Sequence, residues 1–331
     1  PHSAQPMTPA PLWCILGYDA ALVAAPFLLR CGAGTAAAAA LLVAAAFVLA
    51  PPRAYDGRLR ITAIDVGQAD AIAIHTPRGH DLLVDAGGRL ERGSQGDSTA
   101  EDVGVRTVVP FLLREGVHSL DALIVSHPHG DHAGGCRPAL EKLRVAELAD
   151  SGQRYGGHAY HDCVDTARRQ GVRVVYPHAG TRWSTGDGVT LDFLGPSLPF
   201  IVNSRNDINE NSIAFVLRYR SFCMLFTGDA GAAAERRFLE EDVDLRCEVL
   251  KVGHHGSAYS STPAFIDAVR PRYAIVSVGR HNLFGHPAPA TIAALHDAGA
   301  QIFRTDENGA VTIESDGRGV TSIESMLVPD R

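Results

Sequence analysis

Apolar and polar positions divide the chain into two regions that meet near residue 60. Residues 11–29 are apolar apart from Asp19, and residues 31–50 carry no charge. A helix of twenty uncharged residues would cross a bilayer core of roughly 30 Å. We therefore expect residues 1–55 to form one or two transmembrane or membrane-anchor helices, the end of a truncated polytopic region. A signal peptide is the alternative, but its apolar core is shorter and its first residues are basic.

Beyond residue 60, short apolar runs alternate with turns and with segments of helical period. Strands are expected at residues 61–66, 71–75, 81–84, 122–125, 213–218, 223–227, 248–252 and 273–278. Helices are expected at residues 107–116, 138–143, 160–170, 231–240, 263–269 and 289–298. Two strand-rich halves with flanking helices bury their apolar faces best as a four-layer αββα sandwich. Residues 56–331 are therefore predicted to form one α/β domain.

Composition is typical of a folded α/β domain, with 46% hydrophobic and 20% charged residues. The net charge of −7 excludes a broad electrostatic footprint for nucleic acid. None of the six cysteines forms a C-x-x-C pair, so their spacing indicates neither a structural zinc knot nor a readable disulfide framework.

The most informative segment is SHPHGDHAGG, Ser126–Gly135, which follows a predicted buried strand. It places His127, His129, Asp131 and His132 within six positions. Imidazole and carboxylate groups are ligands for zinc, manganese or iron. The glycines of the segment let the backbone turn tightly enough for these side chains to converge. The sequence therefore predicts a metal site at the end of this strand.

Candidate ligands also follow two strands of the second half. His127 and His129 are two residues apart and can bind one metal, while Asp131 and His132 face a second site. Asp229 comes directly after the predicted strand 223–227, where a carboxylate could bridge two metals. His254 and His255 follow the predicted strand 248–252.

The pattern His-x-His-x-Asp-His resembles that of the metallo-β-lactamase superfamily. Further motifs occur in register: DVGQAD (65–70), LLVDAG (82–87), FTGDA (226–230), KVGHHGS (251–257), SVGRHNLFGHP (277–287) and RTDENGAV (304–311). Together they resemble, from about Leu59 to Ser315, the hydrolase domain at the C-terminal end of ComEC, the inner-membrane channel protein of bacterial DNA uptake. The resemblance implies the αββα superfamily fold.

The resemblance also implies roles for individual residues. One of His254 and His255 completes the second metal site; the residues leave the choice open with a preference for His254. The other histidine supports the ligands from behind or contacts substrate. Asp131 binds metal and holds the nucleophile in line. His286, in FGHP, lies at the metal rim, where it hydrogen-bonds the scissile group or protonates a leaving oxygen; the alternative is a surface histidine.

Several polar residues are candidates for positioning the ligands. Asp65, Asp70 and Asp85 could orient histidines through the second ring nitrogen, although Asp65 and Asp85 could equally cap turns. Most superfamily members have a further histidine ligand, and its place here is taken by Asn211 with Ser212, as in the ComEC-like family. An oxygen-richer first site favours manganese or loosely held zinc over a tight zinc pair.

The expected activity follows from two divalent metal ions, manganese or zinc, which activate water and clamp the oxygens of a phosphodiester. No serine or cysteine has the setting of a nucleophile. The resemblance implies a DNA nuclease domain that degrades the non-transported strand. One alternative is an exported or membrane-anchored metallohydrolase acting on small phosphodiesters or other esters; another is a non-catalytic DNA-guiding module. Ala258 stands where the family often has a basic residue, which removes one phosphate contact.

The expected partners are DNA, the membrane through residues 1–55, and other competence proteins; the sequence leaves the oligomeric state open. The resemblance places the hydrolase domain on the outer, periplasmic side of the inner membrane. Arg53, Arg58 and Arg60 after the second apolar run favour the cytoplasmic side by the positive-inside rule. We follow the resemblance here, because orientation depends on all the spans of a polytopic protein.

Overall fold

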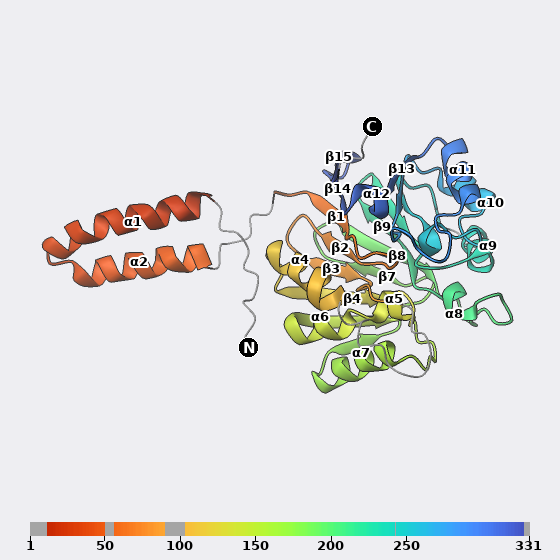
Figure 1. Cartoon of the computed structure of the whole chain (residues 1–331), viewed down its shortest axis with the longest axis horizontal. Coiled ribbons are helices and arrows are strands. Elements are labelled where there is room, and N and C mark those ends of the chain that lie inside the picture. The colour runs from red at the N-terminus through yellow and green to blue at the C-terminus, as the bar shows by residue number, and fades with distance from the viewer. Residues whose placement is uncertain (1–11, 50–55, 90–102, 242, 328–331) are drawn as a thin grey trace. The chain divides into compact units, whose positions relative to one another are not determined.

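The structure is a computed structural model that describes residues 12–49, 56–89, 103–241 and 243–327 (Figure 1). It contains two compact units. The first consists of residues 1–55 with 110–118, and the second of residues 56–109 with 119–331.

Residues 12–49 form a helical hairpin of α1 (Leu12–Arg30) and α2 (Gly34–Leu49). Gly32, at φ 76°, lets the chain reverse between them. No helix among the described residues is long and apolar enough to span a membrane, so the expected spans are not confirmed. The turn divides the apolar run and leaves α2 with 16 residues, about 24 Å of helix.

The second unit is built on two sheets. In spatial order, the eight strands of the first sheet are β15 (Val320–Ser325), β14 (Val311–Ser315), β1 (Leu59–Ala63), β2 (Ile72–His75), β3 (Asp81–Val84), β4 (Ser119–Val125), β5 (Arg144–Asp150) and β6 (Arg173–Val175). The seven strands of the second are β13 (Gln301–Arg304), β12 (Tyr273–Val276), β11 (Val249–Lys251), β10 (Phe222–Phe226), β9 (Ala214–Tyr219), β8 (Val189–Gly195) and β7 (Arg182–Ser184).

The remaining helices are η1 (Gly104–Val108), α4 (Val109–Arg114), α5 (Gly130–Ala133), α6 (Cys136–Lys142), α7 (His158–Arg169), α8 (Asp207–Glu210), α9 (Ala232–Glu240), η2 (Gly253–Gly256), α10 (Pro263–Val269), α11 (Pro289–Asp297) and α12 (Thr305–Asn308). On the first sheet, α6 contacts β5 and α7 contacts β6. On the second, α9 contacts β8 and α11 contacts β13. Figure 1 shows these helices on opposite sides of the paired sheets.

The main core lies between the two sheets. It joins apolar side chains of β1–β4 and β14 to those of β8–β12. Phe215 and Phe226 stack within it, with ring centroids 4.7 Å apart. A second cluster, which includes Phe238 and Phe265, fills the space between the second sheet and α9, α10 and α11. The structure is thus an αββα sandwich of the kind predicted, since each sheet buries one face on the other sheet and one under helices.

Two parallel runs of strands bring distant loops together. β3, β4 and β5 pair in parallel in the first sheet, as do β10, β11 and β12 in the second. The carboxyl ends of parallel neighbours lie at one edge of a sheet. The loops after β3, β4, β10 and β11, which carry the predicted ligands, therefore meet at one edge of the sandwich.

Two disulfides brace the second unit, and their cysteine spacing did not reveal them. Cys136 on α6 is bonded to Cys163 on α7, immediately after the histidine-rich segment. Cys223 on β10 is bonded to Cys247, which precedes β11. Both bonds therefore hold segments that lead into the candidate site.

Candidate metal centre

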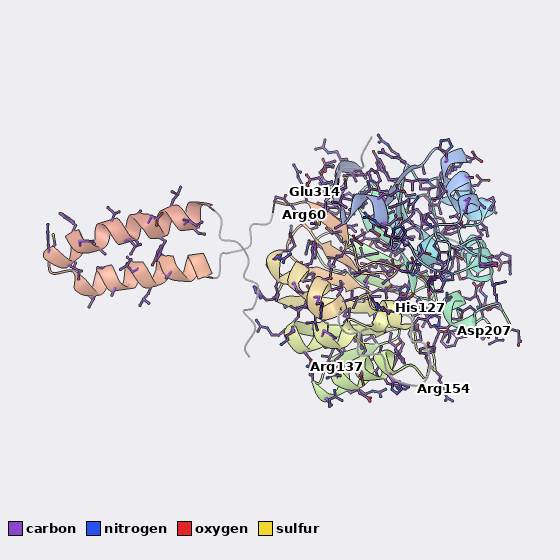
Figure 2. The ribbon with its side chains drawn as sticks, in the orientation of Figure 1. Arg60, His127, Arg137, Arg154, Asp207 and Glu314 are labelled. Carbon is purple, nitrogen blue, oxygen red and sulfur yellow. A yellow bond between two sulfur atoms is a disulfide. The ribbon has the colours of Figure 1, made fainter. Side chains whose placement is uncertain are left out.

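Glycines allow the histidine-rich loop to pack closely against neighbouring backbone. After β4 ends at Val125, the chain turns into the short helix α5, with His129 as its N-cap. A Cβ on Gly135 would lie 2.0 Å from the carbonyl oxygen of Ala86, and one on Gly134 would lie 2.5 Å from that of Gly130. Only glycine allows this close approach to the end of β3. The loop therefore holds His127, which is buried inside the unit (Figure 2).

Asp229 lies between two groups of side chains. Its Oδ2 is 3.8 Å from Nε2 of His127 and 3.7 Å from Nε2 of His254. Its Oδ1 is 3.3 Å from Nε2 of His132 and 3.9 Å from Nε2 of His255. Each oxygen of this buried carboxylate faces a different pair of imidazoles, which is the geometry of a bridging ligand.

Three groups of donor atoms among the described residues are close enough together to hold a metal ion; Asp131 belongs to two of them, and the third consists of Asp70, Asp85 and His132. The first contains His127, His129 and Asp131, and the second contains Asp131, His132, Asp229 and His255. In the first group, Nε2 of His127 is 3.0 Å from Nδ1 of His129. In the second, Oδ2 of Asp131 is 3.5 Å from Nε2 of His255.

The second group has the polar atoms that a cation would satisfy. Four of its buried atoms have no hydrogen-bond partner among the described residues: Asp131 Oδ1, His132 Nε2, Asp229 Oδ1 and His255 Nε2. Buried polar atoms are normally paired, because leaving one unpaired costs about 1–3 kcal/mol. Two imidazoles and two carboxylates are a suitable donor set for zinc or manganese. These residues therefore fit a divalent metal ion.

The structure places His255, rather than the preferred His254, in the second group. Both residues have left-handed backbones, with φ of 48° for His254 and 54° for His255. Non-glycine residues rarely adopt this conformation, and it is maintained where surrounding contacts impose it. The resulting turn sends His255 inward toward Asp131, while His254 stays half-buried beside Oδ2 of Asp229.

Hydrogen bonds orient two of the imidazoles. Oδ2 of Asp85 lies 2.8 Å from Nδ1 of His132, and the same carboxylate accepts from the backbone and hydroxyl of Ser126. His255 donates from Nδ1 to the carbonyl oxygen of Ser277 over 2.9 Å. In both rings, the bond at Nδ1 leaves Nε2 to face the donor group.

The other two predicted aspartates have different contacts. Asp70 accepts a hydrogen bond from Nζ of Lys251 over 2.8 Å, and both side chains are buried. Its Oδ1 is 3.8 Å from Nδ1 of His255, too far to orient that ring. Asp65 is exposed and accepts from the backbone of Gly67, so it caps a turn, the alternative that the sequence left open.

Lys251 is a residue that the sequence reasoning passed over. A lysine inside an apolar strand indicates a buried ion pair, because lysine is almost never fully buried without a partner.

Asn211 and Ser212 do not take the place of the missing histidine. The amide of Asn211 is engaged by the backbone of Ile201 and of Asp207, which points it away from the donor groups. The hydroxyl of Ser212 donates to the carbonyl oxygen of Asn209 and accepts from the backbone of Asp229. The side chain that does face the site is that of Asn209, with Nδ2 3.3 Å from Nε2 of His254. Its buried Oδ1 has no hydrogen-bond partner among the described residues.

The charges of the site are set by burial and by each other. Burial raises the pKa of Asp229, but His132, His254 and His255 outweigh it and hold that pKa well below its usual value. Burial, together with His132, holds the pKa of His127 well below its usual value. Burial lowers the pKa of His132, but Asp229 and the other nearby carboxylates raise it well above its usual value. A divalent cation held by the second group would supply the positive charge that these carboxylates favour at His132.

His286 lies at the edge of this site. Its Nδ1 is 3.3 Å from Nε2 of Gln68, and its ring centroid is 5.5 Å from that of His254. Burial, and then the neighbouring His254, lower the pKa of His286 to about 4. The ring is therefore neutral at neutral pH. The neutral ring carries one N–H that can donate a hydrogen bond.

Comparison with known proteins identifies the class to which this fold and site belong. The family model described as the metallo-beta-lactamase superfamily matches residues 64–280, and the chain belongs to that superfamily. Igni18, a metallo hydrolase from Ignicoccus hospitalis, aligns with a TM-score of 0.48 and 14% identity over 76% of this chain and 98% of that one. The match to the superfamily model shows that the chain has the metallo-beta-lactamase hydrolase fold.

Relatives in sequence narrow the family further. The chain is 28% identical to ComE operon protein 3 of Bacillus subtilis over 253 residues, which are 75% of this chain and 32% of that protein. It is 30% identical to the competence protein ComA of Neisseria gonorrhoeae over 331 residues, which are 99% of this chain and 42% of that protein. The chain thus spans less than half the length of either relative. These homologues confirm the resemblance to the ComEC family.

Proposed function

We propose that this chain is the metal-dependent nuclease domain of a ComEC-like DNA-uptake protein and degrades the non-transported strand. The observation that carries the proposal is the position of Asp229, whose two oxygens face separate groups of histidines. Two divalent cations, manganese or zinc, would supply activated water there and neutralise the charge of a phosphodiester. The similarity to competence proteins supports DNA as the substrate.

Each side chain has a role in this proposal. His127, His129 and Asp131, with Oδ2 of Asp229, would hold the first cation. Asp131, His132 and His255, with Oδ1 of Asp229, would hold the second. Asp131 contributes to both groups and faces the reacting phosphate.

His286 donates a hydrogen bond to a substrate oxygen, and Asn209 lies where a further ligand of the first cation would stand.

We also propose that the hydrolase domain works on the outer side of the inner membrane, anchored through residues 1–55 and near other competence proteins. The two disulfides support this location, because disulfides persist in oxidising compartments and are rare in the cytosol.

The test is a nuclease assay on the purified chain with labelled single- and double-stranded DNA, with manganese or zinc added after chelation. Asp131→Ala should remove metal-dependent cleavage, because it removes a donor from both groups. Asp297→Ala is the matched control, since this aspartate is exposed on α11. Its activity should equal that of the wild type. Metal analysis should give two divalent ions per chain in the wild type.

Three outcomes would overturn the proposal. Unchanged cleavage by Asp131→Ala would reject this site as the source of activity. A folded, metal-loaded chain that cleaves small diesters but no DNA would favour the small-ester hydrolase, and one that binds DNA but cleaves nothing would favour a DNA-guiding module.

A further inference from the structure

A cleft of about 320 Å³ opens beside the metal groups. Its lining includes Arg205, Asn209, Glu210, Asp229, Tyr259 and Phe284. Asp229 and Asn209 are buried, whereas Arg205, Tyr259 and Phe284 are exposed. The cleft therefore leads from solvent toward Asp229, and whatever fills it lies next to the candidate metal centre.

Two aromatic side chains stand at the open end of this cleft. Tyr259 is 53% exposed and Phe284 is 51% exposed. They come from different parts of the chain: Tyr259 follows η2, and Phe284 lies in the loop between β12 and α11. Large apolar rings left in water beside a polar catalytic centre mark a binding surface.

Neighbouring side chains hold both rings. The guanidinium carbon of Arg205 lies 3.7 Å from the centroid of the Tyr259 ring. The rings of Phe284 and His286 have centroids 5.7 Å apart and an interplanar angle of 30°. Asn282 in turn fixes this loop, because its Oδ1 accepts from the backbones of Phe284 and His286. The cleft thus presents supported aromatic faces and an exposed cation.

The one carboxylate at the opening is already engaged. Oε2 of Glu210 accepts hydrogen bonds from the backbones of Gly231 and Ala234, over 3.1 and 2.8 Å. These amides begin α9, where the helix dipole favours a negative charge. Glu210 is therefore occupied as a helix cap, and the guanidinium of Arg205 is the charge available to an incoming anion.

We propose that this cleft binds one unstacked base of a single-stranded nucleic acid, stacked against Tyr259 and Phe284, with Arg205 contacting a backbone phosphate. The inference rests on the proposed function and adds to it the form of the substrate. Aromatic side chains stack on any base, because every base has a π-face, and arginine pairs well with phosphate. A base inside a duplex would first have to leave its stack, which costs a few kcal/mol. The cleft therefore selects single strands and frayed ends.

The test uses single-stranded oligonucleotides that either carry all their bases or lack one base at a defined position, cleaved by the metal-loaded chain. The wild type should cut the phosphate beside the abasic position about 5- to 100-fold more slowly than the same phosphate in the intact strand. Tyr259→Ala and Phe284→Ala should cut both strands at nearly equal rates. Tyr259→Phe keeps the ring and should keep the discrimination.

Tyr176→Ala is the matched control, because Tyr176 is 52% exposed and does not line the cleft. It should behave as the wild type does. As a second readout, fluorescence anisotropy with chelator-treated protein should show weaker binding of the abasic strand by the wild type, and no such difference in Tyr259→Ala.

The outcomes separate this inference from the proposed function. Metal-dependent cleavage that ignores the missing base, or discrimination that survives both alanine substitutions, overturns the base subsite and leaves the nuclease intact. Absence of cleavage on every strand rejects the nuclease. The subsite then depends on the metal-free binding comparison, and equal binding of intact and abasic strands by the wild type overturns it.

Discussion

Replacing Lys251 by methionine should make the second unit much easier to unfold, because the carboxylate of Asp70 then stays buried without its cation. Lys251 and Asp70 are each no more than 2% exposed, and Nζ lies 2.8 Å from Oδ2. Removing one partner of a buried ion pair costs about 3–5 kcal/mol, since the remaining charge stays desolvated. Lys251→Met should therefore lower the free energy of unfolding by about that amount and lower Tm by roughly 6–15 °C.

The effect should depend on pH in a defined direction. Burial raises the pKa of Asp70, but the charge of Lys251, and then those of His255 and His132, hold it below its usual value. Without Lys251, the folded-state pKa of Asp70 rises above its unfolded value. A group shifted upward in this way stabilises the folded state at low pH and loses that contribution as pH rises through the folded pKa. The loss in free energy of unfolding caused by Lys251→Met should therefore be largest near pH 8 and smaller near pH 5.

The assay is urea unfolding followed by circular dichroism in the presence of chelator, so that metal loss does not contribute. Lys142→Met is the matched control, because Lys142 is the only other lysine of the chain and is exposed on α6. The double variant Asp70→Asn with Lys251→Met removes both charges and should be at least about 1 kcal/mol more stable than Lys251→Met alone. A loss below about 1 kcal/mol for Lys251→Met, or strict additivity in the cycle, would refute the reasoning.

Two further predictions concern the orientation of a ligand and the edge of the first sheet. Asp85→Asn should weaken divalent metal binding about 10- to 100-fold, because Asp85 holds Nδ1 of His132; chelator competition measures this, and unchanged affinity with a native far-UV spectrum would contradict it. Glu314→Gln should cost about 0.5–1 kcal/mol at pH 7, since Glu314 on β14 pairs with Arg60 on β1 and with Arg58 (Figure 2). Burial raises the pKa of Glu314, but hydrogen bonds from Arg60 and Arg58 outweigh burial, so the pKa is lowered in the folded state. The ionised carboxylate therefore stabilises the folded state above about pH 4.3, and this contribution is lost as pH falls through the folded-state pKa. Urea unfolding should then show a larger difference in free energy of unfolding between wild type and variant at pH 7 than at pH 3; a difference that does not change with pH would count against the pairing.

Secondary structure could be predicted from the sequence where a short apolar run has clear boundaries. The strand expected at residues 81–84 is β3, and the helix expected at 263–269 is α10, each with the same bounds. In both, residues that disfavour the element flank a short apolar run. β14 was missed although Val311–Ser315 alternates buried and half-buried positions, so the signal was present in the sequence. β6 and β7 have three residues each and are too short for any period to show.

The sequence by itself determined the chemistry of the site, because His127, His129, Asp131 and His132 lie so close in the chain that one loop must bring them together. Tertiary structure decided which way each side chain points and which residues from distant parts of the chain it contacts. His254 and His255 are chemically identical neighbours, and two left-handed backbone conformations decide which one turns toward Asp131.

Tertiary structure also decided which residues support the ligands. Lys251 meets Asp70 across 181 positions of sequence, and Ser277 orients His255 through a backbone carbonyl, which has no signature in a sequence. Asn209 faces the site while Asn211 braces the Ile201 backbone. Local patterns record which groups a segment carries, whereas packing of the two sheets decides which of those groups meet.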